Sequence, residues 1–145
     1  MASIYKETII NAHLDKIYDY VSQPINSLEF WPDLIEIKHL KLLPDGGYSY
    51  RWKYKILNII FRGTGECISL VPRGWIITRN TGGIDCTITY TFRSLDYKTK
   101  VTLTVEYQVH VPVLGRLSEE SIVKMNNQKV ETVLNNLRKK FETES

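Results

Sequence analysis

The spacing of apolar residues changes twice along the chain, and the changes divide it into three parts. Residues 4 to 10 favour an opening strand, and the residues that follow have the 3.6-residue spacing of a short amphipathic helix. A further helical turn is expected over residues 26 to 32, because Pro32 holds Trp31 outside helical geometry. The apolar positions of the first helix are Leu14, Ile17, Tyr18 and Val21.

From residue 35 to residue 111 the pattern has period two, and short turn sequences separate the segments. Turn-forming residues gather at 44–47, 57–58, 72–74, 82–83 and 96–98. Turns this short join neighbouring antiparallel strands, so the pattern predicts a sheet of six to seven strands with one buried face. The clearest apolar positions are Tyr48, Tyr50, Trp52, Tyr54 and Ile56; Cys86, Ile88, Tyr90 and Phe92; and Val101, Leu103, Val105, Tyr107 and Val109.

The last part of the chain, residues 118 to 143, returns to helical spacing. Acidic residues at its start and basic residues at its end suit the dipole of one long helix. A sheet with one apolar face needs a cover, so we expect this helix to lie across it. The prediction is a single α+β domain over residues 1–145. The apolar positions of the helix are Ile122, Val130, Val133, Leu134, Leu137 and Phe141.

Composition agrees with one folded domain and narrows the function classes. Hydrophobic residues make up 43% and charged residues 24% of the chain, which is typical of globular proteins. No apolar stretch approaches the roughly 20 residues of a membrane-spanning helix, and Lys6 and Glu7 interrupt any signal peptide. We therefore expect a cytoplasmic protein. The net charge of +3 gives no reason to expect a nucleic-acid partner.

Motifs for catalysis, metals or cofactors are missing from the sequence. It has no nucleophile elbow, no P-loop and no dinucleotide-binding glycine pattern, and its three histidines are scattered. We therefore expect no metal and no cofactor. If the protein is an enzyme, the sequence does not identify its catalytic residues. Cys67 and Cys86 lack the spacing of a redox or zinc motif and are expected to be reduced. A disulfide between the two cysteines is the alternative if their strands pair.

Aromatic residues on the predicted inner face indicate a small-molecule pocket, although such rings also fill ordinary cores. Arg79 and Asn126 are polar residues at predicted inner positions, so each must be paired, hydrated or facing a ligand. For Arg79 a salt bridge or an outward side chain remains the alternative. Glu66 is ambiguous because its strand has apolar residues on both parities. The candidate ligand-binding residues are Trp31, Trp52, Tyr54, Trp75, Ile77, Arg79, Tyr90, Tyr107, Asn126 and Val130.

Several segments also resemble a known superfamily. These are residues 12 to 21, Trp31-Pro32, Gly63-x-Gly65-Glu66, Tyr90-Thr91-Phe92, residues 101 to 109, and the helix closing at Leu137 and Phe141. Their order resembles the START and birch-pollen-allergen superfamily, within it the polyketide cyclase/dehydrase and lipid transport group. The resemblance implies a helix-grip fold, in which a curved sheet wraps around the C-terminal helix and encloses a cavity for apolar ligands.

Three functions follow as hypotheses. The first is a carrier or sensor for a lipid, an isoprenoid or quinone, or a polyketide-like molecule. The second, implied by the resemblance, is a cyclase or dehydratase in which Arg79 or Glu66 would project into the cavity near an inward tyrosine. The third is an interaction module, with Arg51, Lys53 and Lys55 on one strand face as a basic docking strip. That strip is otherwise a solvated surface. Transient membrane or protein contact and the oligomeric state are left open.

Overall fold

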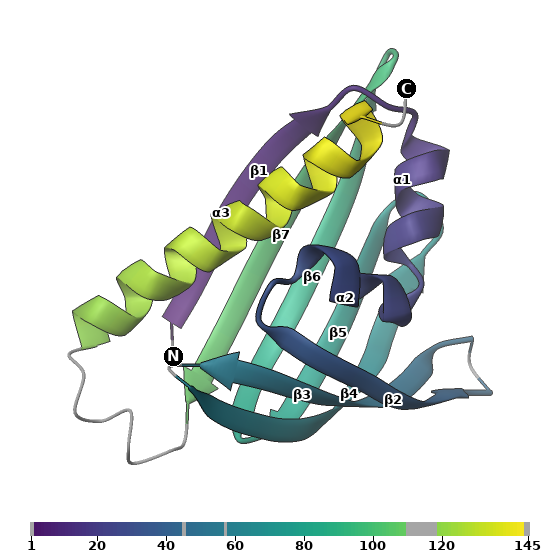
Figure 1. Ribbon diagram of the computed structural model, residues 1–145. Helices are drawn as coiled ribbons and strands as arrows, with labels where there is room; N and C mark the ends of the chain where they lie inside the picture. Colours follow the sequence, from purple (N-terminus) through teal and green to yellow (C-terminus); the bar gives the residue numbers. More distant parts are fainter. Residues whose placement is uncertain (1, 45, 57, 110–118, 144–145) are drawn as a thin grey trace.

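A computed structural model describes residues 2–44, 46–56, 58–109 and 119–143. Its sheet has seven strands: β1 (Ala2–Ile10), β2 (Leu34–Leu42), β3 (Tyr48–Ile56), β4 (Ile59–Val71), β5 (Trp75–Gly82), β6 (Ile84–Leu95) and β7 (Lys98–Val109). Its helices are α1 (Leu14–Val21), the short turn η1 (Pro24–Asn26), α2 (Ser27–Phe30) and α3 (Glu119–Thr143). The predicted α+β order, with short helices after the first strand and a long terminal helix, is confirmed (Figure 1).

All strand pairs are antiparallel, in the order β1-β7-β6-β5-β4-β3-β2. Sequence neighbours pair through hairpins from β2 to β7, and β1 then adds beside β7. Asn58, Arg73 and Asp96 occupy predicted turns and have positive φ values of 66°, 66° and 58°. The sheet curves so that β2 and β3 swing beneath α2, while α3 runs across the side formed by β1 and β7 (Figure 1).

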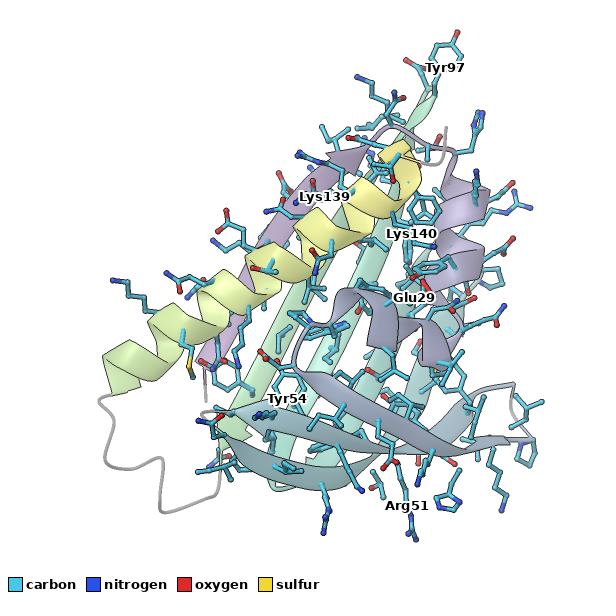
Figure 2. All side chains as sticks on the ribbon, in the orientation of Figure 1. Glu29, Arg51, Tyr54, Tyr97, Lys139 and Lys140 are labelled. Atoms are coloured by element: carbon cyan, nitrogen blue, oxygen red, sulfur yellow. The ribbon has the colours of Figure 1, made fainter. Side chains whose placement is uncertain are left out.

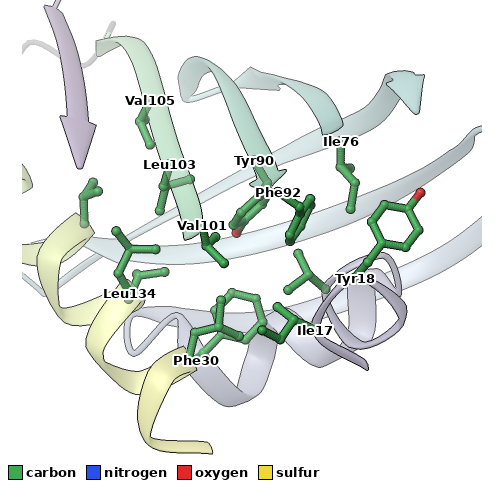
Figure 3. Packing of buried hydrophobic residues seen from close by; sticks show 14 of the residues in the cluster. Ile17, Tyr18, Phe30, Ile76, Tyr90, Phe92, Val101, Leu103, Val105 and Leu134 are labelled. Carbon is green, nitrogen blue, oxygen red and sulfur yellow. The ribbon is translucent and has the colours of Figure 1, made fainter. Parts of the chain in front are cut away.

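The C-terminal end of α3 is packed tightly into the main core. Its buried side chains meet the inner face of β6 and β7 and the two short helices (Figure 3). Phe141 meets the ring of Tyr20 edge to face, with centroids 5.5 Å apart, and Asn136 Nδ2 donates to the Phe30 carbonyl at 3.3 Å. Among the α3 side chains that the structure describes, from residue 124 to residue 143, the buried ones are Val130, Val133, Leu134, Leu137 and Phe141.

Polar contacts hold the same helices together at the surface. Lys140 Nζ lies 3.4 Å from Glu29 Oε1 and 4.7 Å from the centre of the Tyr20 ring (Figure 2). The Tyr20 hydroxyl also donates to Glu29. This end of the domain is therefore closed by α1, α2 and α3 together. No helix in the described part of the chain is long and apolar enough to cross a membrane.

Candidate ligand-binding cavity

A cavity of about 150 Å³ lies between the sheet and the N-terminal half of α3. Two separate groups of buried residues contribute to its wall. The main core supplies residues such as Ile76 and Val105, and a second cluster supplies Trp52, Ile56 and Ile84. The sequence left open whether the inward aromatic rings line a pocket or fill a core. Both occur, because the rings fill the core near the C-terminal end of α3 and line a cavity near its N-terminal half.

Seven of the ten candidate residues line this cavity. Trp52 and Tyr54 come from β3, Tyr90 from β6 and Tyr107 from β7, while α3 contributes two and the end of α2 one. The strict alternation of β3, β6 and β7 placed these residues on the correct face. The seven are Trp31, Trp52, Tyr54, Tyr90, Tyr107, Asn126 and Val130.

The predicted inward orientation of Trp75, Ile77 and Arg79 is wrong, because β5 turns its other parity to the interior. Ile76, Thr78 and Asn80 are the residues of β5 in the cavity wall. Trp75 is 41% exposed and its indole donates to Ser69 Oγ at 2.9 Å on the outer face. Apolar residues stand on both parities of this strand, so periodicity alone could not fix its register.

Arg79 and Glu66 are both exposed, and strand pairing places them directly opposite each other on the outer face of β5 and β4. The hypothesis that either projects into the cavity is therefore wrong. Neither cysteine forms a disulfide in the described structure; Cys67 is buried and Cys86 lies in the cavity wall. Their strands, β4 and β6, are separated by β5.

Two glycines on β4 let large rings of β3 lie across the sheet. Tyr50 pairs with Gly65 and Trp52 with Gly63. A Cβ atom at Gly65 would lie 2.3 Å from Tyr50 Cζ, and one at Gly63 would lie 2.3 Å from Trp52 Cζ2. The Trp52 indole reaches over β4 and donates to the Thr64 carbonyl at 3.1 Å. Each ring therefore occupies space that any larger residue would fill.

Hydrogen bonds fix several of the cavity's polar tips. Trp31 Nε1 donates to the Tyr90 hydroxyl at 2.8 Å, and the Tyr50 hydroxyl donates to Asn80 Oδ1 at 3.0 Å. Burial raises the pKa of Tyr50, Tyr54 and Tyr90, and it raises the pKa of the Cys86 thiol to about 11. These groups therefore stay protonated and neutral at ordinary pH.

Lys129 is the cationic residue of the described cavity wall, and it is already paired. Its Nζ atom lies 2.9 Å from Asp33 Oδ2 and 5.4 Å from the centre of the Tyr54 ring. The wall therefore combines aromatic and aliphatic side chains with a few neutral hydrogen-bonding groups, the usual form of a site for small apolar molecules. Within the described ranges no cluster of histidine, cysteine or acidic side chains could hold a metal ion.

The basic strip lies outside, on the far side of β3 from the cavity. Arg51 and Lys55 are exposed, and Arg51 points away from the helices (Figure 2). Lys53 pairs with Glu36 at 3.1 Å, which also pairs with Lys38 at 2.8 Å. A groove of about 280 Å³ follows this surface. Charged side chains line most of it, so it differs in kind from the cavity.

A curved antiparallel sheet closed over a long terminal helix, with an apolar cavity between them, defines the START-like helix-grip class of proteins. The chain belongs to the polyketide cyclase / dehydrase and lipid transport family, whose model matches residues 1–142. Among curated proteins, none matches the sequence significantly.

Solved structures of low sequence identity share the fold. A Thermus thermophilus protein has a TM-score of 0.84 at 17% identity, with 99% of each chain covered. A START superfamily protein from Mycobacterium smegmatis has a TM-score of 0.83 at 14% identity, again covering 99% of each chain. The Zhui aromatase/cyclase from Streptomyces has a TM-score of 0.79 at 15% identity, covering 97% of this chain and 93% of that one.

Proposed function

We propose that the protein binds an apolar small molecule in the cavity between the sheet and α3 and acts as a carrier or sensor. The observation that carries the proposal is the wall itself, with aromatic rings, aliphatic side chains and protonated tips around a space of about 150 Å³. An apolar cavity of about that volume holds a molecule the size of benzene, so longer ligands must extend toward the rim. Half-buried residues of the lining, among them Pro24, Ser27 and Leu34, are where such a ligand could reach the surface.

A cyclase or dehydratase role is the alternative, supported by the family's description and by the likeness to an aromatase/cyclase. Acid-base chemistry needs a group that changes protonation near the working pH. Burial raises the pKa of Tyr50, Tyr54 and Tyr90 and of the Cys86 thiol in the described wall. The exposed Arg79 and Glu66 are outside. Binding without chemistry is therefore the better supported role. The cytoplasmic location of the protein remains a prediction.

Native mass spectrometry of the purified protein, with extraction of its apolar contents, tests the proposal. Titration with a panel of neutral apolar compounds covers the case in which the natural ligand is lost during purification. Ile88→Trp, in the cavity wall, should abolish binding by filling the space. Ile60→Trp, at a 52% exposed position on β4, is the matched control and should leave binding intact. The proposal is contradicted if the purified protein contains no apolar molecule and also binds no compound of the panel.

The basic strip supports a separate role, docking of an acidic partner through Arg51 and Lys55. The strip lies away from the cavity, so the charge reversals Arg51→Glu and Lys55→Glu should weaken such a complex without changing uptake of apolar compounds. Pull-down of partners with the native and reversed proteins measures this. Identical partner sets would remove the reason for assigning a role to the strip.

A further inference from the structure

One row of cavity residues crosses the sheet from β3 to β7 and is polar. Strand pairing sets Tyr50 opposite Gly65, Gly65 opposite Asn80, Asn80 opposite Cys86, and Cys86 opposite Tyr107. Directly opposed residues of antiparallel strands share a face, with Cβ atoms about 5 Å apart. The side chains therefore form one line on the inner face, and all four belong to the cavity wall.

Two atoms of this row are buried without a good hydrogen-bond partner. Asn80 is 5% exposed and Tyr107 is 7% exposed. Among the residues that the structure describes, neither Asn80 Nδ2 nor the Tyr107 hydroxyl has a hydrogen-bond partner at normal geometry. The group toward which Asn80 donates within the row is the Cys86 thiol, which is only a weak acceptor. Burying an amide or a hydroxyl without a good partner is costly. Both atoms lie just beneath the cavity surface, so a small shift of either side chain toward the cavity would let a ligand oxygen supply the hydrogen bond that the protein leaves unmet.

The orientation of the Asn80 amide decides which kind of oxygen fits. Its Oδ1 atom accepts the hydrogen bond from the Tyr50 hydroxyl, whose ring is held in place across Gly65. That bond leaves Nδ2 with only the weakly accepting thiol of Cys86 beside it, and an amide nitrogen only donates. Asn80 therefore offers a hydrogen to an acceptor such as a carbonyl oxygen. Tyr107, two strands away, can donate to a second oxygen or accept from a hydroxyl.

Charge in the row argues against an anionic ligand. Burial keeps Tyr50 and Cys86 in their neutral forms, and the cation of the described wall, Lys129, is paired with Asp33. A carboxylate or phosphate at Asn80 would lose its hydration without gaining a counter-ion. A neutral oxygen loses far less.

We infer that Asn80 and Tyr107 form a hydrogen-bonding subsite, and that the ligand is a neutral apolar molecule bearing a carbonyl oxygen, such as an aromatic ketone or a quinone. The inference rests on the proposed function, because it names the chemistry of the molecule held in the same cavity. The aromatic walls fit the flat part of such a molecule, and the row fits its oxygen.

Three probes of nearly equal shape test the inference on the whole protein by NMR titration. Acetophenone carries the carbonyl, isopropenylbenzene replaces its oxygen by CH₂, and benzoate carries a charge. A plain apolar cavity prefers the hydrocarbon, which gains more by leaving water. The subsite reverses that order, so acetophenone should bind about 5- to 10-fold more tightly than isopropenylbenzene. Benzoate should bind more weakly than acetophenone.

Variants then locate the preference. Tyr107→Phe and the double variant Tyr50→Phe/Asn80→Leu remove the donors, the second without stranding the Tyr50 hydroxyl. Each should reduce the preference for acetophenone several-fold while leaving isopropenylbenzene binding intact, which also shows that the variant is folded. Tyr97→Phe, at a 79% exposed turn residue, and Asn135→Leu, on the exposed side of α3, are matched controls and should change neither.

The possible failures are distinguishable. If neither neutral probe binds but other apolar compounds do, the subsite is wrong; if no apolar compound binds, the proposed function itself fails. If both bind and the ketone is not preferred, the cavity stands and the subsite is wrong. A preference that survives in both variants would overturn the assignment to Asn80 and Tyr107. Tightest binding by benzoate would overturn the neutral class of ligand.

Discussion

Replacing Gly65 by alanine is expected to destabilise the protein by about 2–4 kcal/mol, because Gly65 lies under the ring of Tyr50. The added Cβ would lie 2.3 Å from Tyr50 Cζ and 2.5 Å from Asn80 Oδ1. Real Cβ atoms do not approach heavy atoms that closely, so the ring must move, and overpacking of this kind costs about 1–3 kcal/mol. Moving the ring also breaks its hydrogen bond to Asn80, which adds about 1 kcal/mol.

Urea unfolding measures the change as a shift in midpoint at constant slope. Gly74→Ala is the matched control, since the nearest atom to its Cβ would be Val71 Cγ1 at 3.1 Å, which a small side-chain adjustment relieves, and the other two nearby atoms, also of Val71, are at 3.5 Å. We expect the control to cost less than about 1 kcal/mol.

A double-mutant cycle separates the ring from other effects of the methyl group. In the Tyr50→Ala background the ring is gone, so Gly65→Ala should cost at least about 1 kcal/mol less than in the native protein. The reasoning is refuted if Gly65→Ala costs the same in both backgrounds, or if it costs less than about 0.5 kcal/mol in the native protein.

Three further predictions follow from the described contacts. Trp31→Phe removes the 2.8 Å bond to the Tyr90 hydroxyl and should cost about 1–2 kcal/mol in urea unfolding; no measurable cost would contradict this bond. Arg79→Ala and Glu66→Ala should leave the uptake of apolar compounds within about two-fold of native, and a ten-fold loss in titration would contradict their outward orientation. Folding raises the pKa of Tyr90 above its ordinary value of 10.0, so above pH 10 this tyrosine ionises more readily in the unfolded protein than in the folded one. The free energy of unfolding should therefore be unaffected by this group below pH 10 and should fall as the pH rises further. Unfolding followed by tyrosinate absorbance should show a loss approaching about 1.4 kcal/mol per pH unit for each such tyrosine, and a flat profile above pH 10 would contradict it.

Strands whose sequence alternates strictly were predictable down to the orientation of each side chain. In β3, for example, Trp52 faces inward and Arg51 outward, as expected. In β5, Trp75, Ile76 and Ile77 are apolar in succession, so either set of alternate residues could have formed the apolar inner face. The outcome depends on pairing with β4, which contains an irregularity between Cys67 and Ser69. One shift of register exchanges the faces of a strand, and no count of apolar residues within that strand reveals it.

The polar row of the cavity was out of reach of sequence reasoning for a related reason. Asn80 faces inward because of the register of β5, and its amide there meets a hydroxyl from β3, which arrives across a glycine of β4. Each of these contacts joins residues far apart in the chain. The same glycines explain why a face so rich in large rings leaves any space at all. Rings standing upright would fill the volume beneath α3, whereas Tyr50 and Trp52 lie against Gly65 and Gly63 and form a floor. The Gly63-x-Gly65 pair, which the sequence offers as a marker of the fold, is thus also a condition for the cavity.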